Sequence, residues 1–189
     1  LNIEYTYPEA TFTEGSYRTV RDAISDIQDI EPGKEVTDSY FTLPPHPEAQ
    51  GLEKELRGRC LHNHITTATR ETALSRFKAL KAGENFHDLS PELKTTYSNA
   101  ERTQNTIYMR LKYDEPSGTV VNVRKSMWIH PELDRAISIR EAARLQTFPD
   151  SFIFEGTKDS QYQQVGNAVP PFLAKAVAES IISILDQVQ

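Results

Sequence analysis

The C-terminal stretch from about Phe172 to Val188 constrains this chain most, because apolar residues cover most of the surface that it would present as a helix. At about 100° per residue, six of them share one side and three more widen the apolar arc to roughly 240°. They are Leu173, Val177, Ile181, Ile184, Leu185 and Val188, and then Ala174, Ala178 and Ile182. Such a helix must be covered on most of its circumference, either by the chain's own core or by a partner surface, and the pattern leaves both explanations open.

The size and composition of the chain fit one domain with at most a small appendage. It has 189 residues, 38% of them hydrophobic, which allows a sizeable core. No stretch approaches about 18 consecutive apolar residues and no charged segment precedes an apolar one, so we expect neither a membrane span nor a secretory signal. The single cysteine, Cys60, excludes a disulfide framework and is typical of a reducing cytoplasm.

The formal net charge of −6 argues at first against a nucleic-acid partner, but the charge is unevenly distributed. The segment from Lys54 to Leu145 holds 16 Lys and Arg against 11 Asp and Glu, whereas the rest of the chain holds 5 against 16. A basic middle between acidic ends can mark a local site for a polyanion. An ordinary solvated surface explains the same counts equally well.

Caps and helical spacing predict several short helices. Thr19 and Asp22 resemble a capping box at the start of one helix. Residues 71–80 have apolar positions at helical spacing and end in basic residues, as a helix C-terminus should. Ser90 followed by Pro91 is typical of a helix start.

A full capping box is the strongest local signal in the sequence. The hydroxyl of Ser138 is placed to accept from the backbone N–H of Glu141, whose carboxylate reaches back. The helix predicted over residues 139–146 must end near Phe148, because Pro149 cannot continue it.

Two strands are predicted earlier in the chain, over residues 106–111 and 119–123. The second is rich in β-branched residues, and residues 114–118 between them form a turn-rich sequence. We therefore expect an α/β chain, more closely a small mixed α+β domain.

Two motifs near the C-terminus carry a specific resemblance. Residues 139–150 read IREAARLQTFPD and residues 164–171 read QVGNAVPP. In this order and spacing they closely resemble the last two conserved blocks of DNA cytosine-5 methyltransferases. Residues 19–24 are similar to the stretch that opens the target-recognition region of these enzymes, and residues 110–120 are similar to its end.

The resemblance implies that only part of such an enzyme is present. These enzymes carry a Gly-rich loop for S-adenosylmethionine, a Pro-Cys nucleophile loop and a Glu that protonates the target base. Here no two of the 8 glycines form a G-x-G sequence, and Cys60 follows Arg59. We therefore expect the C-terminal portion of the enzyme, as a fragment or as one subunit of a split enzyme, that is inactive alone.

The resemblance also implies a domain organisation. We expect residues 1–30 to link from the catalytic domain, residues 31–127 to form the target-recognition region, and residues 128–189 to hold the last two motifs and the terminal helix. That helix would pack on a Rossmann-like catalytic domain that this chain lacks, and its exposed face could make the isolated chain self-associate.

Matching positions carry over three groups of site residues. The Asn167 side chain and the Ala168 backbone N–H would contact S-adenosylmethionine, and only with the catalytic half present, although a simple turn before a helix explains the same residues. The expected DNA contacts are Arg110, Lys112, Thr119, Arg124 and Lys125. Arg140, Glu141 and Arg144 are expected to support the recognition region, although two arginines four positions apart could also hold phosphates.

A metal site is not expected. Cys60, His62 and His64 lie close together in sequence, but zinc needs about four ligands and the remaining histidines show no paired spacing. Arg57 and Arg59 lie near Cys60 in sequence, yet no acid or methyl-donor site accompanies it, so we do not expect a nucleophile there.

The favoured hypothesis is a DNA-recognising segment of a cytosine-5 methyltransferase, of the kind found in restriction and modification. Its partners would be double-stranded DNA and the N-terminal catalytic half, and it would lie in the cytoplasm, on the nucleoid if bacterial. One alternative is a stand-alone DNA-binding or regulatory module that kept the fold without catalysis. A protein-interaction domain with no role on DNA is the other.

Overall fold

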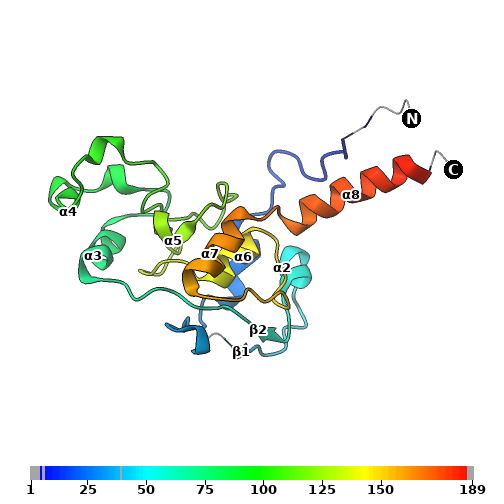
Figure 1. Ribbon diagram of the computed structural model, residues 1–189, viewed down its shortest axis with the longest axis horizontal. Coiled ribbons are helices and arrows are strands. Elements are labelled where there is room, and N and C mark those ends of the chain that lie inside the picture. The colour runs from blue at the N-terminus through cyan, green and yellow to red at the C-terminus, as the bar shows by residue number, and fades with distance from the viewer. Residues whose placement is uncertain (1–4, 6, 39, 187–189) are drawn as a thin grey trace.

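The chain forms a central body of short helices with a lobe on one side and a long helix on the other (Figure 1). The structure is a computed structural model that describes residues 5, 7–38 and 40–186. In the body, α1 (Val20–Ile24) packs against α2 (Gly51–Leu56) and α6 (Ile139–Leu145), and α6 packs against α7 (Lys158–Asn167). The main hydrophobic cluster draws its residues from all four of these helices and includes Trp128, which is 1% exposed.

The capping boxes predicted for α1 and α6 are both confirmed. The Thr19 hydroxyl accepts from the Asp22 backbone N–H, and the Asp22 carboxylate accepts from that of Thr19 at 2.7 Å. At α6 the corresponding distances between Ser138 and Glu141 are 3.0 and 2.7 Å. Each box satisfies N–H groups that a helix start leaves without partners. The helical spacing of apolar residues from Val20 to Ile30 predicts a longer helix after Thr19, but the 3₁₀ turn η1 (Ser25–Ile27) follows α1 directly.

The lobe is built around α3 (Glu71–Ala79) and has an apolar cluster of its own. Phe77 and Phe86 are fully buried in this cluster. Both helices predicted here are present, α3 and α4 (Pro91–Lys94), the latter with Ser90 at its N-cap. The 3₁₀ turns η3 (Phe86–Asp88) and η4 (Ala100–Arg102) flank α4. A segment that has its own core can hold its surface in a defined shape beside the body.

The sheet is small, and the two predicted strands are wrong. Only β1 (Phe41–Thr42) and β2 (Cys60–Leu61) pair, antiparallel, within the part of the chain that the structure describes; the 3₁₀ turn η2 (Val36–Asp38) precedes β1. Residues 106–111 make one isolated bridge, at Arg110, because Tyr108 has a φ of 53° that breaks the extended backbone. Residues 119–122 are irregular and lead into α5 (Val123–Ser126). The mixed α/β class is right, but helices dominate it.

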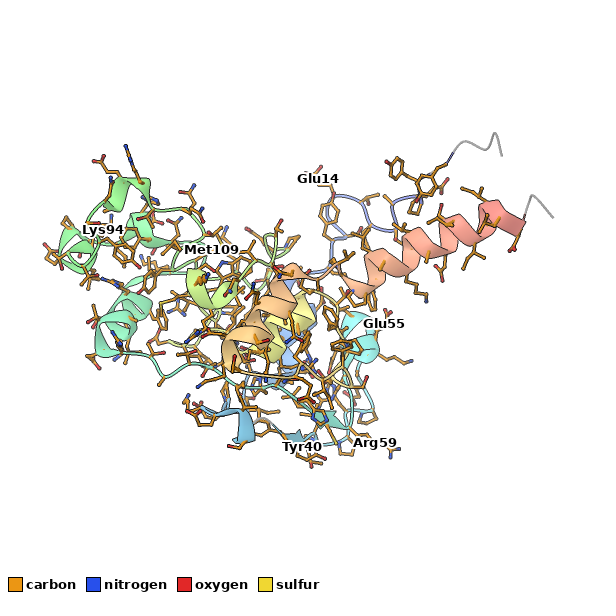
Figure 2. All side chains as sticks on the ribbon, in the orientation of Figure 1. Glu14, Tyr40, Glu55, Arg59, Lys94 and Met109 are labelled. Atoms are coloured by element: carbon orange, nitrogen blue, oxygen red, sulfur yellow. The ribbon has the colours of Figure 1, made fainter. Side chains whose placement is uncertain are left out.

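The predicted terminal helix is α8 (Pro171–Asp186), and the described part of this chain does not cover it. Ile182 is 56% exposed and Leu173 is 54% exposed, and no residue of the helix is buried. Figures 1 and 2 show α8 projecting from the body with most of its side chains standing clear of it. Of the two explanations for its apolar surface, the core of this chain is therefore excluded for the described residues. Val188 lies outside them.

One helical segment, Lys158–Asp186, is long and apolar enough to cross a membrane by length and composition. Residues 168–170 are not helical, however, and they divide this segment into α7 and α8. The 16 residues of α8 rise about 24 Å, which is less than the roughly 30 Å of a bilayer core. The length of α8 therefore gives no support to a membrane span.

Candidate nucleic-acid interface

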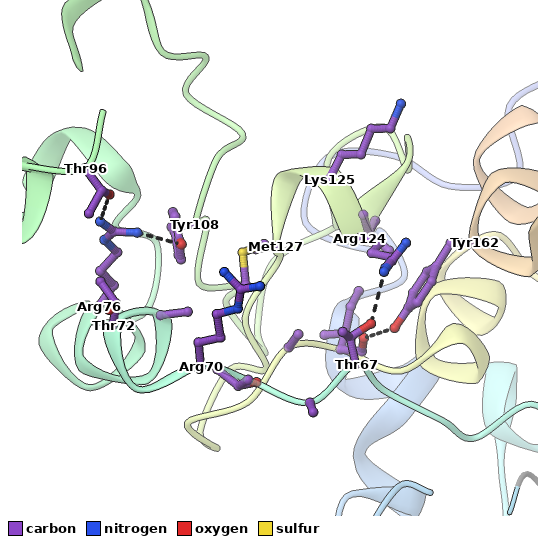
Figure 3. A pocket seen from close by; sticks show the side chains of 16 residues that line it. Thr67, Arg70, Thr72, Arg76, Thr96, Tyr108, Arg124, Lys125, Met127 and Tyr162 are labelled. Atoms are coloured by element: carbon purple, nitrogen blue, oxygen red, sulfur yellow. Dashed lines mark hydrogen bonds between the residues drawn. The ribbon is translucent and has the colours of Figure 1, made fainter. Parts of the chain in front are cut away.

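A groove of about 540 Å³ separates the start of α3 from α5 (Figure 3). Its lining comes from four parts of the chain: the loop 67–70 with the first turns of α3, two further residues of the lobe, the helix α5 with Met127, and three residues of the body. The lining residues are Thr67, Ala68, Thr69, Arg70, Thr72, Ala73, Arg76, Thr96, Tyr108, Val123, Arg124, Lys125, Met127, Ala136, Ile137 and Tyr162. They include three arginines and one lysine but no carboxylate. A protein with a net charge of −6 thus presents a locally positive groove, which favours a polyanion.

Two of the four cations are held by protein partners. Arg76 donates from Nε to the Leu93 carbonyl at 2.8 Å and from Nη1 to the Tyr108 hydroxyl at 2.9 Å, so it joins α3 to the rest of the lobe. Arg124 pairs with Asp159 on α7 and donates to the Thr67 hydroxyl at 3.3 Å. These contacts fix the two walls of the groove and leave the exposed side chains of Arg70 and Lys125 as its accessible charges.

Gly166 sets how closely α7 approaches the irregular segment, residues 119–122, that leads into α5. A Cβ at this position would lie 2.7 Å from the Val121 carbonyl carbon and 2.9 Å from the Asn122 nitrogen, both of them backbone atoms. The Asn122 side chain in turn caps α5 by accepting from the Lys125 backbone N–H. The glycine of the second motif therefore helps to place the helix that carries Arg124 and Lys125.

The arginines of the first motif lie inside the body. Arg140 and Arg144 are both 0% exposed. Arg140 donates to the His62 carbonyl at 2.7 Å and to the Pro149 carbonyl at 2.9 Å, and so ties α6 to two loops. Arg144 donates to both carboxylate oxygens of Asp150, at 2.8 and 2.7 Å. Neither guanidinium can reach a phosphate outside the body.

Burial and pairing shift the pKa values of these groups in opposite directions. Burial lowers the pKa of Arg140 to about 10, because most of its acceptors are uncharged. Burial acts on Arg144 in the same direction, but its bonds to Asp150 outweigh burial and raise its pKa. Both groups therefore stay charged at neutral pH, one held by backbone carbonyls and one by carboxylates.

Glu141 makes a further buried ion pair, with Arg135. Its carboxylate is 0% exposed and accepts from both terminal nitrogens of Arg135, at 2.7 and 2.6 Å. Burial opposes the charged form, but Arg135 outweighs it and lowers the pKa of Glu141 to about 2. The buried His130 ring lies 3.9 Å from this carboxylate, and burial lowers its pKa to about 4. The contact joins α6 to the loop before it, which also contributes two residues to the lining of the groove.

The structure engages the Arg110 guanidinium fully within the chain. Its guanidinium is buried and donates to the carbonyls of Phe77, Leu80, His130 and Leu133 and to Asp134. A guanidinium has five N–H donors, and these five bonds use all of them. Arg110 ties the end of α3 to the 130–134 loop, and in this arrangement it has no donor left for the DNA contact predicted for it.

The other predicted DNA contacts divide into two groups. Arg124 and Lys125 line the groove. Lys112 and Thr119 are exposed but do not line it, and Lys112 pairs with Glu115 at 2.7 Å on a turn of the body. The groove therefore combines two predicted residues with others, Arg70 and Thr67 among them, that the sequence analysis did not single out. The excess of positive charge over residues 54–145 was the only signal that pointed to Arg70.

The two residues expected to contact S-adenosylmethionine lie at the end of α7. Asn167 is the last residue of that helix and its side chain is exposed, whereas the Ala168 N–H donates to the Val165 carbonyl at 3.3 Å. Gly166 and Asn167 are thus helical, and the turn predicted for them begins only at Ala168. The Ala168 N–H, one of the two groups expected to contact the cofactor, is therefore already used within the chain.

Metal-binding residues do not gather anywhere among the residues that the structure describes. Cys60 lies 3.0 Å from the Tyr40 hydroxyl, and the His64 ring nitrogens lie 2.9 Å from the Ile30 carbonyl and 2.9 Å from the Ser138 hydroxyl. Both side chains are thus already engaged with protein groups.

Comparison with known proteins gives consistent matches along the chain. A family model described as C-5 cytosine-specific DNA methylase matches residues 2–183. The type II methyltransferase M.DdeI of Desulfomicrobium norvegicum is 35% identical, covering 96% of this chain and 46% of the relative. The type II methyltransferase M1.HphI of Haemophilus parahaemolyticus is 34% identical, covering 96% of this chain and 40% of the relative. The chain thus spans less than half the length of either.

Two further matches extend this picture. DNA (cytosine-5)-methyltransferase 4 of Arabidopsis thaliana is 34% identical over 86% of this chain and 12% of its own length. A crystal structure of a prophage-encoded E. coli protein, described as a DNA modification methyltransferase, superposes with a TM-score of 0.67. It is 24% identical and covers 89% of this chain and 47% of its own, so it supports the fold alone.

Proposed function

We propose, because the chain belongs to the C-5 cytosine-specific DNA methylase family, that it supplies the target-recognition region and the closing segment of a DNA cytosine-5 methyltransferase. The family methylates cytosine in DNA with S-adenosylmethionine as the methyl donor, and the type II methyltransferases among the relatives support a role in restriction and modification. The observation that carries the proposal is the groove between α3 and α5, lined by four cations and no carboxylate.

Within this proposal residues 31–127 read the DNA and residues 128–189 hold them in position. The groove lies mainly in the first segment, and the buried contacts of Arg140, Glu141 and Arg144 lie in the second. Residues 1–30 lead in from the catalytic part and contribute α1, which packs on α6. The main cluster takes residues from all three segments, which explains how motif residues with no access to DNA can support the groove.

The catalytic part has to come from outside these 189 residues. Methylation at C5 needs a thiolate that adds to C6 of a flipped-out cytosine, an acid near N3 and a bound methyl donor. The sequence has no Pro-Cys pair and no G-x-G loop, and Ala168 has already used its N–H within the chain. We therefore propose that the chain alone transfers no methyl group. The exposed apolar face of α8 then packs on the catalytic part, and Asn167 approaches the cofactor from the end of α7.

Salt-dependent binding of duplex DNA tests the role of the groove. Fluorescence anisotropy with a labelled duplex between 50 and 200 mM salt should give an association constant that falls linearly on logarithmic axes, with a slope of roughly 0.9 per phosphate contact. Lys125→Ala should lower the magnitude of that slope by about 0.9, the value for one phosphate contact. Lys175→Ala is the control, because Lys175 is 72% exposed on α8, away from the groove. Absence of salt-sensitive binding would contradict the proposal, and an equal effect of both variants would remove the groove from it.

Methyl transfer from tritiated S-adenosylmethionine tests the missing catalytic part. This chain alone should transfer none, and mixing it with the N-terminal part of a type II relative should restore transfer to duplex DNA. Transfer by the chain alone would show that its own residues suffice for the chemistry. A chain that binds DNA but activates no N-terminal part would instead favour a stand-alone binding module.

A further inference from the structure

Arg70 is the one arginine of the groove whose guanidinium has no hydrogen-bond or ion-pair partner among the described residues. It lies at the N-cap position of α3, and its exposed side chain points across the groove toward Met127 (Figure 3). The loop 67–70 before it and the helix after it hold its backbone in place. The guanidinium of Arg70 is thus a planar hydrogen-bond donor without a partner, carried by a backbone that is held in place.

The other cations of the groove cannot offer the same geometry. Arg76 uses its Nε and both terminal nitrogens on Leu93, Tyr108 and Thr96. Arg124 is engaged by Asp159 and Thr67. Lys125 is free, but an ammonium group is a point charge that suits a phosphate and lacks the planar fork of arginine.

The side chains that line the groove also narrow the choice of base. In the major groove of DNA, Asp and Glu accept from the N4 amino group of cytosine, Asn and Gln pair with adenine, and Arg pairs through two bonds with O6 and N7 of guanine. None of the lining residues is Asp, Glu, Asn or Gln. Among these pairings the groove therefore favours guanine, and Arg70 is the residue with two donors free to make it.

We propose that Arg70 is a specificity-determining residue that reads one guanine of the recognised DNA sequence through O6 and N7, while Lys125 holds the phosphate backbone beside it. This assignment rests on the proposed function, since it requires duplex DNA in the groove. It goes beyond that function by naming the reading residue, the base and the two base atoms.

The test starts from a pool of duplexes with a randomised central stretch, because the recognised sequence has to be found first. Wild-type chain should enrich duplexes that share a guanine at one position, and replacing that guanine by 7-deazaguanine, which lacks N7, should weaken binding. Arg70→Lys keeps the charge and loses the fork. It should therefore lower the preference for that guanine by about 5- to 150-fold, with the salt dependence of binding unchanged.

A matched control separates this effect from a general loss of charge or fold. Arg102→Lys makes the same change at an exposed arginine of the lobe that lies outside the groove, and it should leave the preference intact. A preference that Arg70→Lys leaves unchanged, a wild-type pool without an enriched guanine, or indifference to 7-deazaguanine would each overturn the assignment while salt-sensitive binding still supports the proposed function. Loss of all duplex binding by the wild type would overturn both.

Discussion

Asp150→Asn should strongly destabilise the chain, because it removes the charge of a buried ion pair without changing the size of the side chain. Both oxygens of Asp150 accept from Arg144, at 2.8 and 2.7 Å, and one also accepts from the Gly58 backbone N–H at 3.0 Å. Both partners of the pair are 0% exposed. The asparagine would turn an amide N–H₂ group toward guanidinium donors, and the Arg140 guanidinium, whose Nε lies 3.9 Å from Asp150, would lose its nearest counter-charge.

The size of the effect follows from burial. Removing one partner of a buried pair costs about 3–5 kcal/mol, since the remaining charge stays out of water with less compensation; of its ion pairs, Arg144 would keep only the one with Asp26. For a domain of this size each kcal/mol lowers the unfolding midpoint by about 2–4 °C, so we expect a drop of roughly 6–20 °C. Trp128 reports the transition, because it is the only tryptophan and is 1% exposed in the main cluster.

Asp114→Asn is the matched control. Asp114 also accepts from an arginine, Arg21, at 2.8 Å, but its side chain is 82% exposed and that of Arg21 is 49% exposed. Water screens such a pair, so this variant should leave the midpoint unchanged. Equal effects of the two substitutions would refute the reasoning that burial, rather than the ion pair as such, makes the first motif a scaffold.

Three further predictions concern other parts of the body. The free energy of unfolding should fall as the pH drops from about 6.5 to about 4, because His130 is protonated in the unfolded chain before it is protonated in the folded one. It should fall further from about 4.5 to about 2, because Glu141 then takes up its proton. Urea titrations that show the same free energy of unfolding across both windows would contradict this. Gly166→Ala should cost about 1–3 kcal/mol by overpacking against residues 121–122 and should also weaken DNA binding, and unchanged urea midpoints and anisotropy would show that α7 can move aside. Arg110→Lys should lower the free energy of unfolding by roughly 1–3 kcal/mol, because buried carbonyls lose their donor. It should leave the salt dependence of DNA binding unchanged, and a weaker salt dependence would indicate that Arg110 contacts a phosphate.

Local signals predicted the helices well and the strands badly, for a physical reason. The box at Ser138 and Glu141 is satisfied within four residues, so no distant partner is needed to form it. A strand exists only where a second strand pairs with it, and residues 106–111 and 119–123 have no such partner along their length. Their β-branched residues serve the core instead, as the burial of Val120 and Val123 shows.

The candidate interface was predictable only in outline. All four cations of the groove lie within the positive segment that the charge counts marked over residues 54–145, and Arg124 and Lys125 were named from the resemblance. The count treats every arginine alike, however. Arg70 was missed because nothing in its local sequence distinguishes it from Arg76, which lies six residues away and is fully engaged.

The sequence by itself determined the features that depend on near neighbours: the caps of α1 and α6, the apolar surface of α8 and the motifs that identify the family. Only the tertiary structure decided which charges are available. Arg110 meets carbonyls from residues 77, 80, 130 and 133, and Arg144 meets Asp150 and Asp26, so both are consumed inside the body. A buried guanidinium must find acceptors wherever the fold brings them, and such acceptors come from positions that no local pattern connects.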